Sequence, residues 1–267
     1  MKRRSPLASR VLARLWPPAL AIILVLLVWQ VIFIAEIKPS YVLPPPTAVG
    51  GQLATMLADG KFWQAVATTM TRAVVGFIVA VAIGTALGIA VSRSRVLKAA
   101  IGAVLTGLQT MPSIAWFPFA ILLFGLTEQA ILFVVVLGAA PSIANGLISG
   151  IDDVSPQLLR TAHTLGAQGA VLYRLVVIPA ALPAYLGGLK QGWAFAWRSL
   201  MAGELLVIIA SRPSLGVQLS FFRDFANAPA LIAVMVVILV IGMLIDGLFS
   251  WTANGVRRRR GLGLTQV

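Results

Sequence analysis

Six long apolar stretches divide the chain, and each is long enough to cross a lipid bilayer as a helix. The hydrocarbon core of a bilayer is about 30 Å thick and is spanned by roughly 20 apolar residues in a helix, which satisfies its own backbone hydrogen bonds in lipid. The pattern therefore predicts an all-α, polytopic membrane protein with six transmembrane helices. Their expected bounds are residues 17–35, 73–91, 99–126, 130–151, 182–209 and 229–245.

The first stretch follows a basic start, Met1 to Arg4, which is similar to the charged region of a secretory signal peptide. The apolar run after it is long, and no small-x-small cleavage site follows it. We therefore expect residues 17–35 to be a retained transmembrane helix. Beyond it, residues 38–46 are proline-rich and extended, and residues 47–70 are suited to interfacial helices.

Prolines inside the predicted spans indicate irregular helices. Pro112 and Pro118 lie in the third span, Pro141 lies in the fourth, and Pro183 lies at the start of the fifth. A proline within a helix removes a backbone hydrogen bond, so we expect interruptions at these positions. Irregular backbone at membrane depth is tolerated inside protein or along a water-filled path, although simple kinks that fit the helices together are an alternative. The residues at the interruptions that are candidates for a translocation path are Met111, Pro112 and Asn145.

The composition agrees with a membrane protein and excludes several kinds of chemistry. Hydrophobic residues make up 59% of the chain and charged residues 11%, against about 45–50% and about 25% in soluble proteins. The absence of cysteine excludes disulfides and thiolate metal sites, and a single histidine makes a histidine metal cluster implausible. No phosphate-binding P-loop, Gly-x-Ser-x-Gly or His-Glu-x-x-His motif is present. We expect no metal, no bound cofactor and no catalytic residues in this chain.

The net charge of +13 predicts an orientation in the membrane rather than a nucleic-acid partner. An N-terminus inside the cell places most of the 21 Lys and Arg residues in the cytoplasm, as the positive-inside rule requires. With six spans, both termini are then cytoplasmic in a multi-pass protein of the cell membrane, the plasma or inner membrane. The run Arg257 to Arg260 is a stop-transfer charge cluster in the preferred interpretation, and a binding site for anionic lipid is the alternative.

The loop 152–177, between the fourth and fifth spans, has a pattern of its own. Ser155-Pro156 is typical of a helix start, and Gly166 allows a turn before a second short helical run over residues 168–175. Between them is an apolar stripe at helical spacing, formed by Leu158, Leu159, Ala162 and Leu165. The pattern predicts two short helices joined by a tight turn, forming a compact loop that faces the cytosol.

The segment RTAHTLGAQGAVLYRLVVIPAALP, residues 160–183, resembles the conserved loop of binding-protein-dependent ABC importer permeases. The family pattern is Glu-Ala-Ala, three residues, Gly, nine residues, Ile, one residue, Leu-Pro. Gly166 occupies the Gly position, Val176 the Ile position and Ile178-Pro179 the final pair. Arg160 stands where the family usually has Glu, and Thr161 also departs from the pattern.

Three further segments are similar to the nitrate, sulfonate and taurine branch of that family. They are LPPPTAV at 43–49, LQTMPSIAWFPFAILLFG at 108–125 and GWAFAWRSLMAGELL at 192–206. The resemblance covers roughly residues 63–251. It implies a type I ABC importer permease core over 63–251, preceded by residues 1–62 with the first span and an extracytoplasmic connector, and followed by a basic cytoplasmic tail over 252–267.

The resemblance also implies partners. These are a second copy of the chain, two cytosolic ABC ATPase subunits that use ATP and Mg, an extracytoplasmic solute-binding protein and membrane lipid, with no nucleic acid. The loop would insert into a groove on the ATPase and convert its closure into movement of the membrane helices. The alternative is an ordinary loop folded onto its own helices. The coupling residues so implied are Leu158, Leu159, Arg160, Thr161, Ala162, His163, Leu165, Gly166 and Pro179; for His163 a solvated contact is preferred to a pH switch.

Ionisable residues inside the fifth span need a reason, since charges in lipid are costly. Lys190, Trp197 and Glu204 recur every seven residues and share one helix face; both charged groups lie near span ends, where they could snorkel or cap a loop. Arg198 lies near the middle of the span and needs water or a partner. Its planar guanidinium suits a small oxyanion such as a sulfonate, and an ion pair with an acid of another span or of a second copy is the alternative. The span's candidates for the translocation path are Arg198, Trp197 and Glu204.

These observations favour the permease subunit of an ATP-driven importer of a small anion, an aliphatic sulfonate, taurine or nitrate. The same machine for a vitamin precursor such as a thiamine pyrimidine is the alternative within transport. A secondary transporter or a membrane-embedded enzyme is the alternative from another class. Those classes need intramembrane acids or a catalytic cluster, and the spans contain few acids besides Glu204 and Asp246.

Overall fold

The computed structural model describes residues 7–209 and 211–259, which are helices joined by turns and loops, with no β-strand in that part. The chain divides into two compact units. One contains Met1–Phe62 and Leu219–Val236, and the other contains Trp63–Gln218 and Val237–Val267. The all-α class predicted from the sequence is confirmed.

The first unit begins with the long helix α1 (Leu7–Ile34), followed by a proline-rich connector and the short helix α2 (Pro46–Ala58). The Trp29 indole Nε1 donates a hydrogen bond of 3.0 Å to the Pro44 carbonyl, which ties α1 to the connector. Pro45 caps α2 and Pro46 is its first residue, a position where a proline costs no helical hydrogen bond. A helix within the predicted interfacial segment is therefore present.

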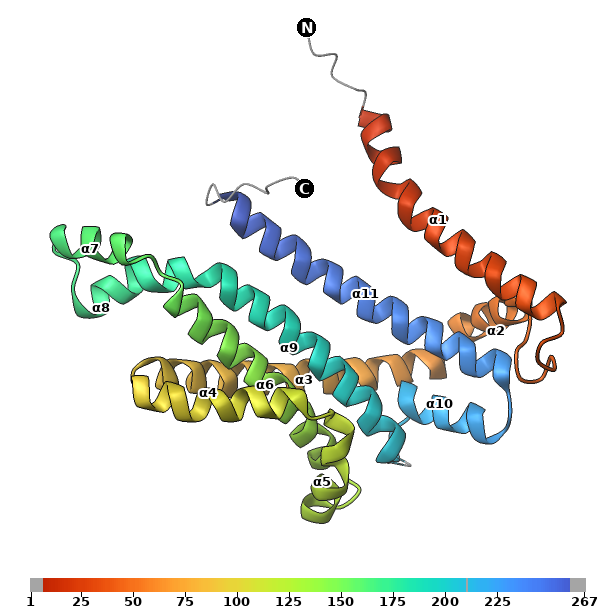
Figure 1. Ribbon diagram of the computed structural model, residues 1–267. Helices are drawn as coiled ribbons and strands as arrows, with labels where there is room; N and C mark the ends of the chain where they lie inside the picture. The colour runs from red at the N-terminus through yellow and green to blue at the C-terminus, as the bar shows by residue number, and fades with distance from the viewer. Residues whose placement is uncertain (1–6, 210, 260–267) are drawn as a thin grey trace, which may run out of the picture. The chain divides into compact units, whose positions relative to one another are not determined.

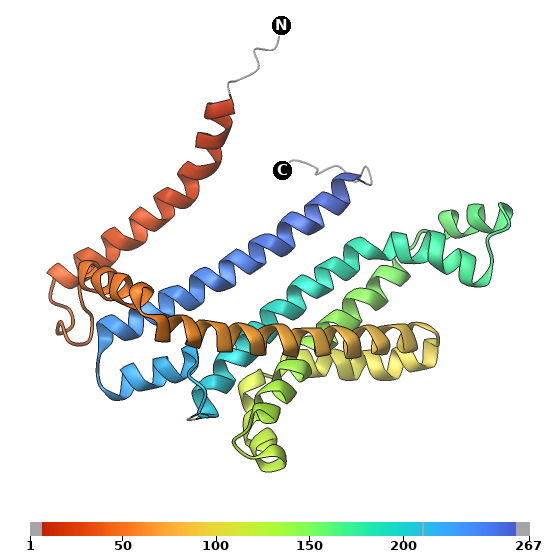
Figure 2. The same ribbon diagram turned by 180° about the vertical axis from the view of Figure 1, so that it is seen from behind.

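The second unit is built around α3 (Gly60–Ser92), α6 (Glu128–Asp152) and α9 (Ile178–Leu206). Figures 1 and 2 show α6 and α9 side by side, and α4 (Arg95–Thr110) also packs on α6. The short helices α7 (Pro156–Thr164) and α8 (Gly169–Leu172) connect one end of α6 to α9. The last two helices, α10 (Leu215–Asp224) and α11 (Ala228–Arg259), each contain residues of both units.

Small residues let α6 and α9 approach each other at backbone distance. A Cβ placed on Gly146 would lie 2.5 Å from the Gly188 Cα, and a Cβ on Gly150 would lie 2.6 Å from the Ala181 carbonyl oxygen. Because lipid is as apolar as the side chains, helices in a membrane associate through close packing rather than through the hydrophobic effect. The glycines are thus what allows this pair to form.

The same packing joins α3 to α6, and aromatic rings fill the space beside it. A Cβ on Gly84 would lie 2.6 Å from the Ala140 carbonyl oxygen. Phe77 of α3 contacts Trp193 of α9 and Phe249 of α11 edge-on, with ring centroids 5.2 and 5.8 Å apart. These rings border a core of fully buried side chains that includes Phe117, Ile131, Val134, Ile143 and Leu200.

The number of membrane spans agrees with the sequence prediction once one broken helix is counted. Within residues 7–209 and 211–259, five helices are long and apolar enough to cross a membrane, and a sixth span is formed if α4 and the following segment count as one. That segment comprises the 3-10 helix η1 (Ser113–Trp116) and α5 (Phe117–Phe124), and it turns by 101° relative to α4. The break predicted at Pro112 is confirmed. The break predicted at Pro118 is wrong, because Pro118 lies in the first turn of α5, where a proline is tolerated.

Two other predicted interruptions are also wrong. Helix α6 continues through Pro141 and Asn145, and α9 continues through Pro183. The helical hydrogen bond lost at Pro141 is offset by dense packing, since Pro141 and its neighbours on both sides are buried. The irregular backbone before α9 is instead the π-helical turn η2 (Tyr173–Val177).

Three boundaries also differ from the prediction. Helix α3 begins at Gly60 and includes the second half of the predicted interfacial segment, and α9 ends at Leu206, three residues early. Helix α11 extends to Arg259, so most of the basic run continues the last helix. Arg260 lies outside the described residues.

The contact between α6 and α9 predicts opposite effects of two neighbouring substitutions. Gly188→Ala should destabilise the protein by about 1–3 kcal/mol, the usual cost of overpacking, because its Cβ would meet the Gly146 Cα at 2.8 Å. Gly187→Ala is the matched control, since no atom lies within 4 Å of its added Cβ and alanine favours a helix. Thermal unfolding of both variants in detergent checks this. Equal melting temperatures would contradict close packing at Gly188.

Candidate functional site

The loop between α6 and α9 folds into two short helices with well-formed ends. Ser155 precedes α7, and its Oγ accepts a hydrogen bond of 3.3 Å from the Gln157 N–H, while Pro156 is the first helical residue. This is the N-terminal cap that the sequence predicts. The turns after Ser155 therefore have little freedom to shift along the chain.

The end of α7 is closed by Gly166, which has a φ of +82°. The Gly166 N–H donates to the His163 carbonyl (3.0 Å) and the Ala167 N–H to the Ala162 carbonyl (2.9 Å). This pair of bonds is the Schellman motif, and it requires a residue in the left-handed region, where glycine has no Cβ to clash. The predicted turn at Gly166 is confirmed.

The leucines of this loop differ in how far the described part of the chain covers them. Leu165 is 82% exposed and Leu158 is 45% exposed, while Leu159 is partly buried and Ala162 is buried. Arg160, Thr161 and His163 are exposed, and Pro179 is partly buried in the first turn of α9. For Leu165, the alternative that the loop packs onto its own helices is therefore wrong, whereas Leu158 is partly covered by the chain and partly exposed.

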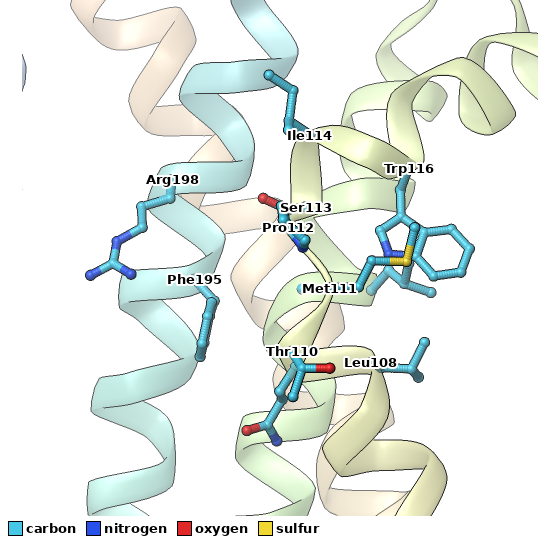
Figure 3. A pocket seen from close by; sticks show the side chains of 12 residues that line it. Leu108, Thr110, Met111, Pro112, Ser113, Ile114, Trp116, Phe195 and Arg198 are labelled. Carbon is cyan, nitrogen blue, oxygen red and sulfur yellow. The ribbon is translucent and has the colours of Figure 1, made fainter.

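A second candidate region lies at the break between α4 and α5. A cavity of about 280 Å³ is lined by residues of α4, η1, α6 and α9. Figure 3 shows Met111, Pro112 and Ser113 on one side of it and Phe195 and Arg198 on the other. The break in the third span therefore brings together three of the six candidates for the translocation path: Met111, Pro112 and Arg198.

Arg198 lies on this cavity without an acidic partner. Its side chain is exposed, its guanidinium carbon lies 5.9 Å from the centre of the Phe195 ring, and Figure 3 shows the guanidinium directed away from Met111 and Pro112. Within the described residues, Arg198 has no ion pair, so the alternative of a pair with an acid of another span in this chain is wrong there. An acid of a second copy stays an alternative.

The other three candidates do not line this cavity. Trp197 stacks on Trp193, with ring centroids 6.2 Å apart, and packs against Gly242 of α11. Asn145 lies inside the continuous helix α6 and Glu204 is completely buried. A polar group that the sequence did not single out is present instead. The Gln109 Nε2 is buried at the cavity with no hydrogen-bond partner among the described residues.

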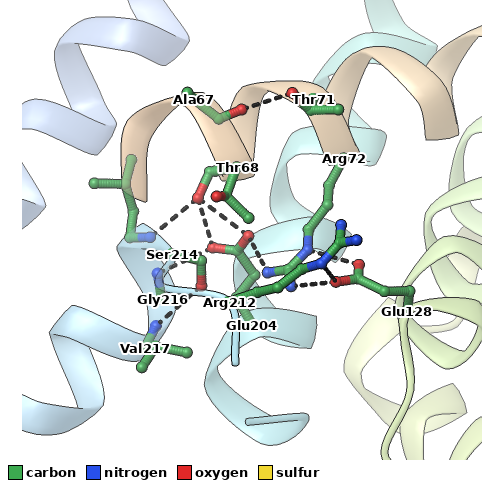
Figure 4. Close-up of polar contacts among 12 residues, drawn as sticks. Ala67, Thr68, Thr71, Arg72, Glu128, Glu204, Arg212, Ser214, Gly216 and Val217 are labelled. Carbon is green, nitrogen blue, oxygen red and sulfur yellow. Dashed lines mark hydrogen bonds and ion pairs between the residues drawn. The ribbon is translucent and has the colours of Figure 1, made fainter. Parts of the chain in front are cut away.

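Glu204 belongs to a buried cluster of charges, which Figure 4 shows and which the sequence did not reveal. Arg72 of α3 lies between two carboxylates, 2.9 Å from Glu204 and 2.6 Å from Glu128 at the start of α6. The Thr69 hydroxyl also donates to Glu204 (2.9 Å), as does the Gly216 N–H (3.0 Å). Contrary to expectation, Glu204 neither snorkels nor caps a loop: it is buried, pairs with Arg72 and accepts from Gly216 in the first turn of α10.

A signal for this cluster was present in the sequence. Arg72 stands at the start of the second predicted span, Glu128 stands between the third and fourth, and Glu204 lies near the end of the fifth. All three positions fall at the same end of the predicted bundle. Matching charges by expected depth, rather than by spacing along one helix, would have paired them.

The remaining intramembrane charge, Lys190, is paired near the middle of α9, rather than near a span end as predicted. Its Nζ donates to the Ser250 hydroxyl (2.8 Å) and lies 3.2 Å from an Asp246 carboxylate oxygen, both on α11. Nearby, Lys98 of α4 forms an ion pair with Asp152 at the end of α6. Among the described residues, no group of three His, Cys, Asp or Glu side chains is placed to hold a metal ion.

The apolar helices are those of a polytopic membrane protein. Residues 80–258 match the family described as "Binding-protein-dependent transport system inner membrane component", and the chain belongs to this family. Membership sets aside the secondary transporter and the membrane-embedded enzyme. It also confirms the resemblance drawn from the loop sequence.

Individual relatives support the same assignment. The taurine transport system permease protein TauC of Escherichia coli strain K12 is 28% identical over 251 residues, which cover 92% of this chain and 89% of TauC. The riboflavin transport system permease protein RibX of Chloroflexus aurantiacus is 30% identical over 252 residues, 90% of this chain and 92% of RibX. The solved inward-facing MetNI methionine ABC transporter matches with a TM-score of 0.55 at 21% identity, over 73% of this chain and 93% of that chain, and shows the same fold.

The charge cluster predicts a graded loss of stability. Arg72→Met leaves Glu204 buried without a cation, and removing one partner of a buried ion pair costs about 3–5 kcal/mol. Glu204→Gln keeps a side chain of the same shape that can still accept hydrogen bonds, and it leaves Arg72 paired with Glu128. The loss of stability in this variant should therefore be smaller. The control is Arg223→Met, whose ion pair with Asp224 is exposed and should contribute at most about 1 kcal/mol. Melting temperatures measured in detergent rank the three variants by stability. A melting temperature of Arg72→Met equal to that of wild type would contradict the prediction.

Proposed function

We propose that this chain is the membrane-spanning subunit of an ATP-driven importer, and that α7 docks into a groove of a separate ATPase subunit. The observation that supports this most directly is the exposure of Leu158 and Leu165 on a short helix capped at both ends. Two exposed leucines on a rigid element at the end of a membrane bundle are suited to an apolar groove on a partner. Hydrolysis of ATP, with its Mg, is assigned to that partner.

The mechanism follows from the connections of the loop. Helix α7 follows α6 closely, and α8 continues through η2 directly into α9. A capped helix moves as a unit, whereas a flexible loop would absorb a displacement. Movement of the ATPase would therefore be transmitted to both central helices. Helix α9 also places Arg198 at the cavity beside the break in the third span.

The remaining partners follow from the same proposal. The positive-inside rule places α7 and both termini in the cytoplasm, with the Arg72 cluster at the extracytoplasmic end. A solute-binding protein would deliver substrate to that side. Two copies of the chain would form the importer, and the exposed guanidinium of Arg198 would then face the path between them.

The substrate class supported best is a small oxyanion such as a sulfonate, taurine or nitrate. Arg198 and Gln109 both line the cavity at the break, the Gln109 Nε2 has no hydrogen-bond partner among the described residues, and none of the lining residues is acidic. Guanidinium and amide N–H groups are the donors that a sulfonate or nitrate oxygen accepts. The relative TauC, a taurine permease, agrees with this class. The similarity to RibX makes a vitamin or vitamin precursor the second candidate.

The direct test is substrate-stimulated ATP hydrolysis by the importer reconstituted with its ATPase and binding protein. We expect taurine, alkanesulfonates or nitrate to raise the rate, and riboflavin and a thiamine pyrimidine to have no effect. Stimulation by a vitamin alone would reject the anion. Hydrolysis by the isolated chain would reject the assignment of ATP to a partner.

Gly166→Val should uncouple the importer while leaving the membrane bundle folded. Valine is disfavoured at a φ of +82°, so the end of α7 would be displaced. Gly166→Asn is the matched control, because asparagine tolerates the left-handed region. Co-purification of the ATPase and the dependence of its hydrolysis on substrate are the measurements. If the valine variant couples like the asparagine variant, α7 is not the coupling element.

Arg198→Ala should reduce anion uptake by about tenfold or more, since a hydrogen bond to a charged group contributes about 1.5–3 kcal/mol. Arg198→Lys should restore part of it, because a point charge lacks the planar pair of donors. Assembly with the ATPase should be preserved in both variants, because Arg198 has no ion pair in the described chain. Uptake assays in proteoliposomes give the comparison. Normal uptake by Arg198→Ala, or loss of the complex, would assign Arg198 a different role.

A further inference from the structure

A larger cavity lies at the opposite end of the helices from the Arg72 cluster, where the α7–α8 loop joins the bundle. Its volume is about 910 Å³, near the upper end of the roughly 300–1,000 Å³ usual for ligand sites. The walls come from α3, α6, α8, η2 and the start of α9. It shares no lining residue with the cavity at Arg198. The two cavities are therefore separate sites.

The two ends of this cavity differ in chemistry. One end holds Arg93, just after α3, and Arg174, in the π-helical turn. The other end holds Thr85 and Tyr185, whose hydroxyls are hydrogen-bonded to each other at 2.7 Å. Eight residues separate Thr85 from Arg93, or about 12 Å at the helical rise per residue. Between the ends the wall is apolar, with side chains that include Ile89, Leu147, Ile151, Val177, Ile178 and Leu182.

The positive charge at the arginine end is not compensated by the described residues. Arg93 and Arg174 are both exposed and take part in none of the ion pairs or side-chain hydrogen bonds found there. No acidic residue lines the cavity, and the nearby Asp152 is held by Lys98. An anion is therefore the group that complements this end.

The π-helical turn is a second, independent feature of the cavity. It supplies Tyr173, Arg174 and Val177 to the wall. A π turn is less stable than the α-helix it interrupts, and such turns occur frequently at functional sites. A local irregularity that costs stability and lines a cavity indicates that the wall is shaped for an occupant.

We propose that this cavity binds one anionic phospholipid, with its phosphate between Arg93 and Arg174 and one acyl chain along the apolar wall. A free phosphate or nucleotide would leave the apolar wall empty, and an uncharged lipid would leave both arginines without a partner. Basic sites between transmembrane helices are known to hold anionic lipid head groups. The cytoplasmic leaflet as the source rests on the proposed function; the binding itself does not.

The position of the lipid gives it a structural consequence. Its phosphate would connect the end of α3 to the turn that leads from the α7–α8 loop into α9. Bound lipid would therefore hold the loop in place relative to the bundle.

Lipid retention by the full-length chain in detergent tests this, measured by native mass spectrometry after incubation with equal amounts of dioleoyl phosphatidylglycerol and dioleoyl phosphatidylcholine. Wild type should retain one phosphatidylglycerol per chain in preference. Arg174→Gln and Arg93→Gln should each reduce retention by about tenfold, as expected for loss of a charge-assisted hydrogen bond. Arg160→Gln is the charge-matched control, because Arg160 is exposed on α7 and does not line the cavity.

Ala170→Trp tests the cavity without a change of charge. Ala170 is exposed on the wall, so a tryptophan there should block the acyl chain and release lipid, whereas Ala170→Ser should retain it. Melting temperatures show that the variants fold.

Three results would overturn the proposal: equal retention of both lipids, retention unaffected by the arginine substitutions, or displacement by inorganic phosphate alone. Exclusion of lipid when the ATPase is bound would also overturn it, since the cavity would then be part of that interface. None of these results depends on transport, so failure here leaves the Gly166 and Arg198 tests of function standing.

Discussion

The close approach of α6 and α9 is the constraint on which the rest of the second unit depends. With Gly146 and Gly188 facing each other at backbone distance, no side chain separates the two helices. The pair is joined at one end by the α7–α8 loop. At the other end it contributes Glu128 and Glu204 to the ion pairs of Arg72. A displacement of the loop that moves α9 must therefore move α6, or else separate two backbones that are already in contact.

The two ends of this helix pair are secured in different ways. At the Arg72 end, the ions are buried and paired, so opening that end would expose charges to a low dielectric or require new partners. At the loop end, the ion pair of Lys98 and Asp152 is exposed. Exposed ion pairs are worth much less than buried ones. The asymmetry makes the loop end the one that moves at lower cost, which is where an ATPase would act.

The sequence predicted the elements that depend on interactions between residues close together in the chain. The apolar runs predicted the spans, and Ser155-Pro156 and Gly166 predicted the loop helices, because caps and turns depend on neighbouring residues. The failures occurred where distant packing decides. Pro141 and Pro183 do not break their helices, since tertiary contacts compensate for the lost hydrogen bond. The Arg72 cluster joins residues from α3, α6, α9 and α10, so no spacing along one helix could reveal it.

The charged residues within α9 differ in whether they have an acidic or basic partner in the chain, and this difference separates structural from functional roles. Lys190 is neutralised by Asp246 and Glu204 by Arg72, both on neighbouring helices of this chain. Arg198, between them in sequence, has no acidic partner in the described residues, and its contact with the Phe195 ring compensates only part of a full charge. The charges on both sides of Arg198 are thus paired within the chain, whereas Arg198 lies unpaired beside a cavity and a broken helix. We therefore assign the anion that would neutralise Arg198 to a ligand or to a second copy of the protein.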